Sequence, residues 1–182
     1  ADLIERLQAW GINADSEVVL YDDGPGAFAA RAWWLLAWLG KRDGVFILDG
    51  GLKAWHAAGL PLSLDPPAIG RGTFTGTPDV SLLLSAEQLQ KRLGQPSLTL
   101  LDARALARFK GEVEPIDAVA GHVPGARNHP FTSSLDAQGR FLPPDELRRR
   151  LSASLDGVPA HRTIAMCGSG VTACHLLLAL EH

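Results

Sequence analysis

Short apolar runs alternate along the chain with longer stretches in which apolar residues recur every three or four positions. The short runs are typical of buried strands and lie at residues 18–21, 45–48, 100–102 and 164–166. The longer stretches predict helices at residues 1–10, 29–40 and 171–180, from residue 86 and from residue 144. Because strands and helices alternate, we predict an α/β protein with parallel sheets that helices cover on both faces.

An irregular segment at residues 63–80 divides the chain. It holds two prolines and two glycines between residues 65 and 72 and continues as extended polar chain, which is typical of an interdomain linker. We therefore predict one domain at residues 1–62 and a second at residues 81–179. The first helix of the second domain should begin at the capping box Ser85-Ala86-Glu87-Gln88.

Composition narrows the classes of function. The chain of 182 residues has a net charge of -3 and a pI near 6.1, so it lacks the basic surface of a nucleic-acid-binding protein. No apolar stretch reaches the length of a membrane span, and we expect no membrane partner. The histidines and the two cysteines show neither metal-ligand spacing nor a disulfide framework, so we expect no metal, no cofactor and a cytoplasmic location.

Cys167 lies where an apolar strand becomes a glycine-rich turn and then a helix. Gly168 and Gly170 can adopt positive φ, so that successive N–H groups turn inward and form a cradle for an anion. The N-terminus of the following helix adds a positive dipole. This arrangement favours a thiolate and predicts a reactive nucleophile.

The alternative is that Cys167 is an inert buried cysteine, which is common in apolar stretches. Cys174 fits that description better, because it lies inside the predicted helix among apolar neighbours. The two cysteines are too far apart in sequence for a Cys-x-x-Cys redox pair.

The loop Cys-Gly-Ser-Gly-Val-Thr-Ala at residues 167–173 resembles the active loop of the rhodanese-like sulfurtransferases, in particular the tandem-domain 3-mercaptopyruvate type. Further motifs of a rhodanese domain match in order and spacing. They are Leu-Leu-Asp-Ala-Arg at 100–104, Arg-Phe-Lys-Gly at 108–111 and Ala-Gly-His-Val-Pro-Gly-Ala at 120–126. The resemblance implies two rhodanese-like domains, of which both are incomplete in this sequence.

The resemblance also implies a reaction. Cys167 would take sulfur from 3-mercaptopyruvate or thiosulfate, hold it as a persulfide, and pass it to a thiol acceptor such as thioredoxin, or to cyanide. Ser169 would polarise the donor's carbonyl group or relay a proton. The rest of the loop would bind the substrate through Gly168, Gly170, Val171 and Thr172. Because the loop carries no basic residue, it suits a donor with a carboxylate better than it suits thiosulfate.

Two arginines are candidates for binding the anionic group of the donor. Arg104 is the first choice, because it follows the carboxyl end of a predicted strand, where open α/β sheets bind ligands. A guanidinium there can hold a carboxylate through two hydrogen bonds. Arg108 is the second choice, and Asp102 is expected to orient Arg104. For each arginine a structural ion pair is the alternative.

The first half repeats this pattern without the chemistry. The strand at 18–21 leads through a glycine-containing turn into a helix, as the strand before Cys167 does. The alignment places Asp22, or its neighbour Asp23, at the position of Cys167. A carboxylate cannot accept sulfane sulfur, so we expect this turn to be the inactive counterpart of the Cys167 loop.

The sequence departs from the family pattern in several ways. Ile116 stands where many mercaptopyruvate-type members have an arginine after a Glu-Pro pair. The His-x-Pro-Gly segment of a first rhodanese domain and the last strand and helix of the second are absent. The histidine and aspartate proposed to assist the loop serine are therefore missing, and we expect weak or no turnover. The final residues 180–182, Leu-Glu-His, resemble the remnant of an affinity tag and are therefore left out of the fold reasoning.

Two other classes of protein compete with this interpretation. A cysteine phosphatase also uses a thiolate in a strand-loop-helix cradle, but it needs an arginine where this chain has Ala173. A non-catalytic rhodanese-like module would only bind a partner or carry sulfur. The presence of Cys167, both loop glycines and Arg104 argues against that second alternative.

Overall fold

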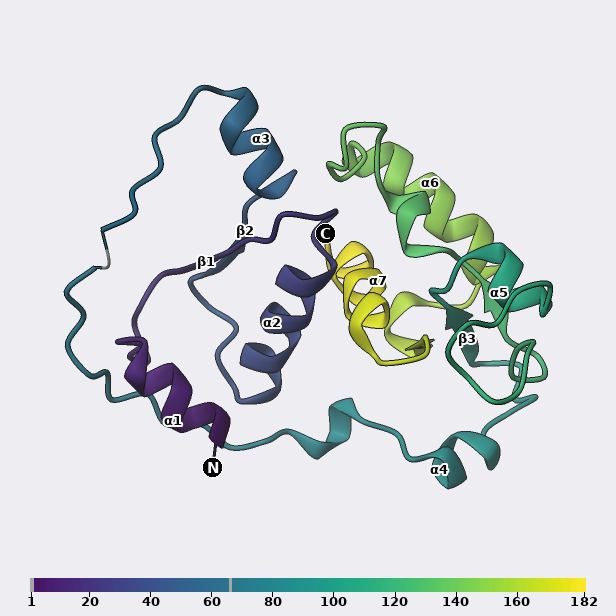
Figure 1. The fold of residues 1–182 in the computed structure, drawn as a ribbon. Coiled ribbons are helices and arrows are strands. Elements are labelled where there is room, and N and C mark those ends of the chain that lie inside the picture. Colours follow the sequence, from purple (N-terminus) through teal and green to yellow (C-terminus); the bar gives the residue numbers. More distant parts are fainter. Residues whose placement is uncertain (1, 66) are drawn as a thin grey trace.

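The computed structural model describes residues 2–65 and 67–182 (Figure 1). The first half contains α1 (Asp2–Ala9), β1 (Val18–Leu20), α2 (Ala27–Trp38), β2 (Val45–Ile47) and α3 (Gly51–Ala57). The second half contains helices α4 (Ala86–Gln90), α5 (Leu106–Lys110), α6 (Pro144–Leu155) and α7 (Val171–Glu181). Its strands are β3 (Thr99–Asp102), β4 (Arg127–Asn128) and β5 (Thr163–Met166), and short 3-10 turns lie at Val80–Leu82, Phe131–Ser134 and Ala160–Arg162.

The strands form two parallel sheets, one in each half. In the first, β1 pairs with β2 in the register Val18 to Val45. In the second, the order is β4-β3-β5, and β3 lies centrally. All four residues of β3 are buried. The predicted α/β class with parallel sheets is therefore confirmed.

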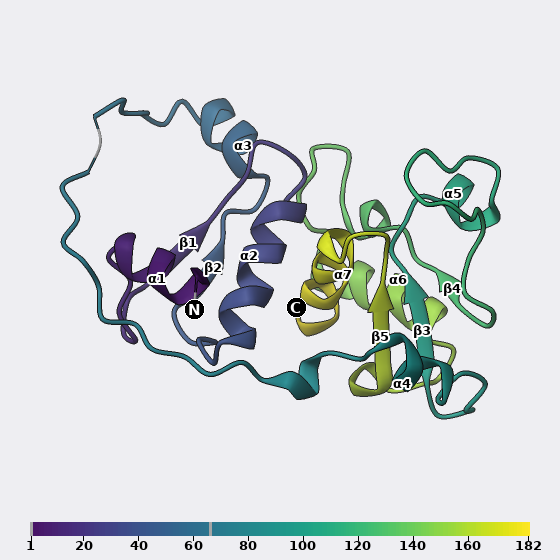
Figure 2. The same ribbon diagram turned by 60° about the horizontal axis from the view of Figure 1, so that its bottom comes forward.

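Helices α2 and α7 pack against each other between the two sheets. Figure 2 shows β1 and β2 beside α2 on one side, and β5, β3 and β4 beyond α7 on the other. α2 follows the turn after β1, and α7 follows the turn after β5, so the two turns are brought to the same central layer. This packing connects the two halves of the chain.

Each half has its own apolar core. In the first half Leu7, Leu36, Leu39 and Phe74 are buried together, with residues of β1 and β2 against them. In the second half β3, α6 and α7 contribute the buried cluster of Leu101, Ala103, Leu142, Leu147, Leu151, Leu155, Leu176 and Ala179. The residues of β3 are all buried, whereas one face of the first sheet is partly exposed. Val19 and Phe46, which point to the opposite side of β1 and β2, are 57% and 52% exposed.

Part of the segment predicted as a linker packs against the first domain. Its described residues contain no helix or strand before Val80. However, the Phe74 side chain is 3% exposed, and its N–H donates to the Ile12 carbonyl at 3.0 Å. The N–H of Gly72 donates to the Gln8 carbonyl at 2.7 Å. The second part of the segment thus belongs to the first half, because Phe74 completes its apolar core.

Two other local features of the sequence have clear outcomes in the structure. The capping box is confirmed, since the Gln88 N–H donates to Ser85 Oγ at 3.1 Å and the Ser85 N–H donates to Gln88 Oε1 at 2.8 Å. Residues 180–182, which were left out of the fold reasoning, contact the second half. Leu180 packs against the second core, and the ring of His182 lies 6.0 Å from the ring of Phe141.

Candidate active site

Cys167 occupies the turn between β5 and α7, as the sequence pattern predicts. Gly170 caps α7 with a left-handed backbone, φ 82°, which a residue with a side chain adopts rarely. Its N–H donates to the Cys167 sulfur at 3.0 Å. The sulfur therefore lies at the N-terminus of a helix of 11 residues, where the helix dipole stabilises negative charge.

The remaining loop residues surround this sulfur unevenly. Cys167 is partly buried, Gly168 and Ser169 are exposed, and Val171 and Thr172 are partly buried in the first turn of α7. Gly168 does not have the positive φ that we expected of it. The Ser169 hydroxyl has no hydrogen bond to any side chain or backbone group in the described part of the chain. Ser169 is thus free to contact a ligand.

Arg108 lies directly beside the loop. A Cβ atom on Gly168 would be 3.6 Å from Arg108 Nη2 and 3.7 Å from Nη1. Glu114 holds this guanidinium, with Nη2 to Oε1 at 2.6 Å and Nε to Oε2 at 3.3 Å. Nη2 also donates to Asp117 Oδ2 at 3.0 Å. Arg108, the second choice from the sequence, is therefore the arginine that borders the loop.

The contacts of Arg104 favour the alternative of a structural ion pair. Its side chain is 6% exposed and donates to both carboxylate oxygens of Asp102, with Nη2 to Oδ2 at 2.7 Å. Nη2 also donates to the Gly121 carbonyl at 2.6 Å, and Nη1 to Glu114 Oε2 at 3.3 Å. These hydrogen bonds raise the pKa of Arg104 and occupy its donors. Arg104 binds the loop at Gly121 and pairs with Asp102, so its guanidinium is enclosed by these partners.

Glu114 links the two arginines. Its carboxylate is 5% exposed, and the hydrogen bond from Arg108, followed by the N–H groups of Asp117 and Ile116, lowers its pKa to about 2. A carboxylate that stays charged at neutral pH fixes Arg108 against the loop. Ile116 itself is 76% exposed and presents no polar group, in agreement with its inability to bind an anion.

The Asp22 turn is built like the Cys167 loop. Gly26 caps α2 with φ 84°, and the Asp22 carboxylate lies inside the turn. Oδ1 accepts the N–H groups of Gly24 and Gly26, both at 3.0 Å, and Oδ2 accepts those of Phe28 at 2.9 Å and Ala29 at 3.1 Å. Of the two aspartates weighed from the sequence, Asp22 is the one whose carboxylate occupies the position of the Cys167 sulfur.

The two turns also contact each other's helices. Arg31 in α2 approaches the N-terminus of α7, with Nη1 3.6 Å from a Cβ built on Gly170 and 3.6 Å from Cys174 Sγ. In the opposite direction His175 in α7 approaches the N-terminus of α2, with Nε2 3.8 Å from a Cβ built on Gly26. Cys174 is 3% exposed, and burial raises the pKa of its thiol, so it has a packing role as predicted.

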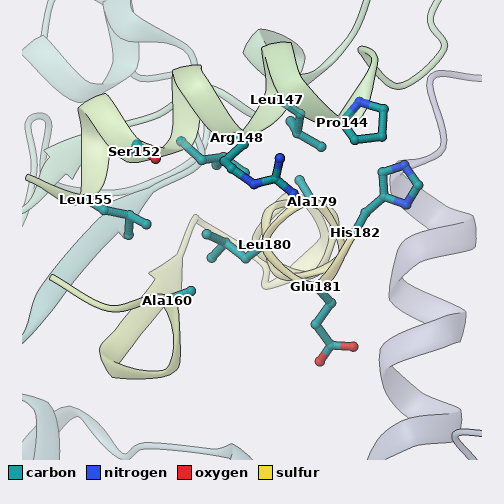
Figure 3. A pocket seen from close by; sticks show the side chains of 11 residues that line it. Pro144, Leu147, Arg148, Ser152, Leu155, Ala160, Ala179, Leu180, Glu181 and His182 are labelled. Atoms are coloured by element: carbon teal, nitrogen blue, oxygen red, sulfur yellow. The ribbon is translucent and has the colours of Figure 1, made fainter. Parts of the chain in front are cut away.

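Two hollows of the described chain lie near the second half, and Cys167 lines neither of them. One, of about 330 Å³, lies between α6 and the C-terminal end of α7, beside Arg148, Glu181 and His182 (Figure 3). The other is an open groove of about 1070 Å³ behind the loop, lined by α2, β5 and α7. Within residues 2–65 and 67–182, no helix is long and apolar enough to cross a membrane, and no group of three or more His, Cys, Asp or Glu side chains could hold a metal ion. The loop itself combines a partly buried Cys167 with the exposed Gly168 and Ser169.

Sequence reasoning did not identify Glu114, Asp117 or Arg31 as neighbours of the site. A signal was available for the first two, because an Arg-x-x-x-x-x-Glu-x-x-Asp spacing puts two acids after a basic helix end. No comparable signal marks Arg31, since its approach to α7 depends on how the two halves pack.

Comparisons with known proteins agree with this architecture. Residues 1–58 match the model of the rhodanese-like domain. A protein of Pseudomonas aeruginosa described as "Probable 3-mercaptopyruvate sulfurtransferase" is 64% identical over 181 residues, which cover 100% of this chain and 64% of the relative. The human 3-mercaptopyruvate sulfurtransferase is 36% identical over 172 residues, covering 92% of this chain and 57% of the relative. The chain therefore spans less than two thirds of the length of these relatives.

A solved structure is similar over almost the whole chain. SseA from Escherichia coli, described as having the "rhodanese" fold and grouped with the 3-mercaptopyruvate sulfotransferases, superposes with a TM-score of 0.83 at 32% identity. The superposition covers 99% of this chain and 67% of that one.

Proposed function

The chain belongs to the rhodanese-like family, and on that premise we propose that it takes part in sulfur transfer with Cys167 as the nucleophile and sulfur carrier. The observation that carries the proposal is the Gly170 N–H, which donates to the Cys167 sulfur at 3.0 Å where β5 meets α7. This N–H and the helix dipole favour the thiolate, which is the reactive form of cysteine.

With 3-mercaptopyruvate as donor, the thiolate attacks the donor's sulfur and a sulfur–sulfur bond forms. The carbon–sulfur bond of the donor breaks, its electron pair goes to carbon, and that carbon takes the proton of the donor's thiol. The products are pyruvate and the Cys167 persulfide. With thiosulfate, the thiolate attacks the outer sulfur and sulfite leaves with the electron pair.

In the second step an acceptor takes the outer sulfur. A thiolate, such as that of reduced thioredoxin, attacks it, forms a new persulfide and releases the Cys167 thiolate. Cyanide gives thiocyanate in the same way. The two cysteines are free, which is compatible with a reducing compartment such as the cytoplasm, and fractionation of cells that produce the parent protein would test that location.

We assign the anionic group of the donor to Arg108. Its guanidinium borders Gly168, whereas that of Arg104 is enclosed. Ser169 is exposed beside the reacting sulfur and would polarise the donor's carbonyl or relay a proton. The exposed Gly168 and the loop N–H groups would contact the outer sulfur of the persulfide.

Phosphatase chemistry is disfavoured by the same geometry. The position that would close a phosphate-binding loop with arginine is Ala173, which is 5% exposed and packed inside α7. The loop therefore lacks the arginine at its own end that would hold a transferred phosphoryl group.

Mass spectrometry of the intact chain tests the proposal. After incubation with 3-mercaptopyruvate or with thiosulfate, we expect the mass of one sulfur atom to be added on Cys167. We expect turnover to be weak even where this single addition is complete. Cys167→Ser should gain no sulfur, and Cys174→Ser, the matched control, should gain it as the wild type does. A wild-type chain that gains no sulfur from either donor would contradict the proposal.

A further inference from the structure

The guanidinium of Arg108 already has an exchangeable anionic partner. Nη2 donates to Asp117 Oδ2 at 3.0 Å, in addition to its hydrogen bond with Glu114. The Asp117 side chain is 43% exposed, whereas that of Glu114 is 5% exposed. Glu114 is therefore a fixed partner of Arg108, and Asp117 is the one that can turn into solvent.

Asp117 lies where a bound donor would lie. A Cβ atom on Gly168 would be 3.6 Å from Asp117 Oδ2, the same distance as from Arg108 Nη2. The carboxylate is thus in contact with both the loop that follows Cys167 and the arginine assigned to the donor. A carboxylate brought by a donor would compete for the same Nη2 hydrogen bond.

Displacement of Asp117 by a donor would change the net charge of the arginine and carboxylate groups beside the Cys167 loop. The guanidinium groups of Arg104 and Arg108 face the carboxylates of Asp102, Glu114 and Asp117. Two positive charges thus meet three negative charges, which leaves a net charge of -1 beside the loop. Rotation of Asp117 away from Arg108 removes this excess charge locally and opens one hydrogen-bonding position. No basic side chain of the loop itself compensates, because residues 168–173 are uncharged.

We propose that Asp117 is a specificity-determining residue that competes with the donor for Arg108 and selects against doubly charged donors. The proposal rests on the sulfur transfer proposed above. Thiosulfate carries two negative charges, whereas 3-mercaptopyruvate with a neutral thiol carries one, and like-charge repulsion from Asp117 grows with the charge of the donor. Asp117 therefore favours the singly charged donor even when it has turned partly into solvent.

The test compares two donors on Asp117→Asn, which keeps the size and the hydrogen-bonding oxygen of the side chain and removes its charge. We expect persulfide formation on Cys167 to reach half its maximal rate at a lower concentration of both donors. The decrease should be about fivefold to tenfold for thiosulfate and about twofold for 3-mercaptopyruvate, as expected for loss of one nearby like charge at a partly exposed site. The maximal rate should change little, since Asp117 does not contact the reacting sulfur.

Asp156→Asn is the matched control. Asp156 is also an exposed partner of an arginine, Arg127, but that pair does not border the loop. We expect this variant to leave both donor concentrations unchanged. If Asp117→Asn lowers the half-maximal concentrations of thiosulfate and 3-mercaptopyruvate by the same factor, or leaves both unchanged, the proposal is overturned.

A second measurement separates this inference from the sulfur-transfer proposal. Sulfate, an unreactive dianion, should protect Cys167 from alkylation by iodoacetamide, and peptide mass spectrometry can follow Cys167 alone. Asp117→Asn should be protected at a several-fold lower sulfate concentration than the wild type. Tighter sulfate protection without persulfide formation would support the role of Asp117 and contradict sulfur transfer, whereas persulfide formation with unchanged sulfate protection would do the reverse.

Discussion

The Asp22 turn and the Cys167 loop use the same backbone design for opposite purposes. In each, a strand runs into a turn that ends at a left-handed glycine, and a helix begins at the next residue. The Asp22 carboxylate accepts four N–H groups of its turn, so no donor remains for a ligand among them. The Cys167 sulfur accepts one N–H, from Gly170. The side chain at the end of the strand thus decides whether the turn is a closed structural element or an open site.

The comparison extends to the helices that follow. Arg31 and His175 occupy equivalent positions, each on the second turn of its helix, and each reaches the capping glycine of the other helix. The charged residue faces the Cys167 loop, and the residue buried without charge faces the Asp22 turn. An arginine lies beside the loop that contains the Cys167 sulfur, and a neutral ring lies beside the turn that already holds the Asp22 carboxylate.

The largest expected effect comes from placing the side chain of the Asp22 turn in the Cys167 loop. Cys167→Asp should abolish sulfur uptake, a loss of at least about 10³-fold, because a carboxylate cannot form a persulfide. The new carboxylate should accept the Gly170 N–H and stabilise the N-terminus of α7 by about 1 kcal/mol. Sulfur uptake is measured by mass and stability by urea unfolding.

Cys167→Ala is the control for that variant, since it removes the thiol without adding an acceptor. We expect it to be equally inactive and no more stable than the wild type. If Cys167→Asp unfolds at a lower urea concentration than Cys167→Ala, the two turns do not share an anion-binding backbone.

The next largest effect concerns His175 and pH. Its ring is fully buried, stacks on Phe141 with ring centroids 4.7 Å apart, and has no hydrogen-bond partner for either nitrogen in the described part of the chain. Burial lowers its pKa to about 4 from 6.5, although the nearby Asp22 carboxylate opposes the shift. The unfolded chain therefore binds a proton that the folded chain excludes between these two pH values. We expect up to about 3 kcal/mol of folding free energy to be lost as the pH falls from about 6.5 to about 4.

His175→Phe isolates this contribution, because phenylalanine keeps a flat ring and cannot take up a proton. Urea unfolding of both proteins at a series of pH values gives the difference directly. His129, which is also buried with a lowered pKa, is present in both proteins and cancels in that difference. If the free energy of unfolding falls equally steeply with pH in both proteins between about pH 6.5 and 4, His175 does not take up its proton as inferred.

Removal of the Asp22 carboxylate should have a smaller but clear effect. Asp22→Ala leaves four N–H groups of the turn without their acceptor. Because the turn is partly exposed, water can reach some of them, and we expect a loss of about 2 kcal/mol. Thermal unfolding measures it, and Asp23→Ala, at the exposed neighbouring position, should lie within about 0.5 kcal/mol of the wild type. Equal stability of the two variants would contradict the capping role.

Both turns could be predicted from the sequence because their signals are local. An apolar strand, a glycine and an apolar helix lie within a few residues of Cys167 and of Asp22, so spacing alone identifies them. Which of Arg104 and Arg108 borders the loop could not be predicted from the sequence, for a physical reason. The two arginines differ in which carboxylates meet them, and that depends on how the loop from Glu114 to Gly121 folds back on α5.

The same reasoning explains the other errors. Phe74 lies in a segment whose composition is that of a linker, and nothing local indicates that the core of the first half lacks a side chain that Phe74 supplies. The approach of Arg31 to Gly170 depends on the packing of α2 against α7, which joins residues more than a hundred positions apart. Contacts of this kind follow from the assembled fold and leave no pattern in either segment.

The smallest predicted effect concerns the contact of Arg31 in α2 with α7. Arg31 lies over the Trp34 ring, 5.1 Å from its centroid, and donates to Cys174 Sγ at 3.6 Å. Arg31→Met keeps an apolar stem and removes both interactions, so we expect a loss of about 1 kcal/mol in urea unfolding. The control is Arg42→Met, since Arg42 is 52% exposed and has only a 3.8 Å ion pair with Glu181, which should contribute less than about 0.5 kcal/mol. If both variants lose the same free energy of unfolding, Arg31 contributes no more than an exposed arginine. The similarity of the two halves would then be limited to their turns and would not extend to the contacts of α2 with α7.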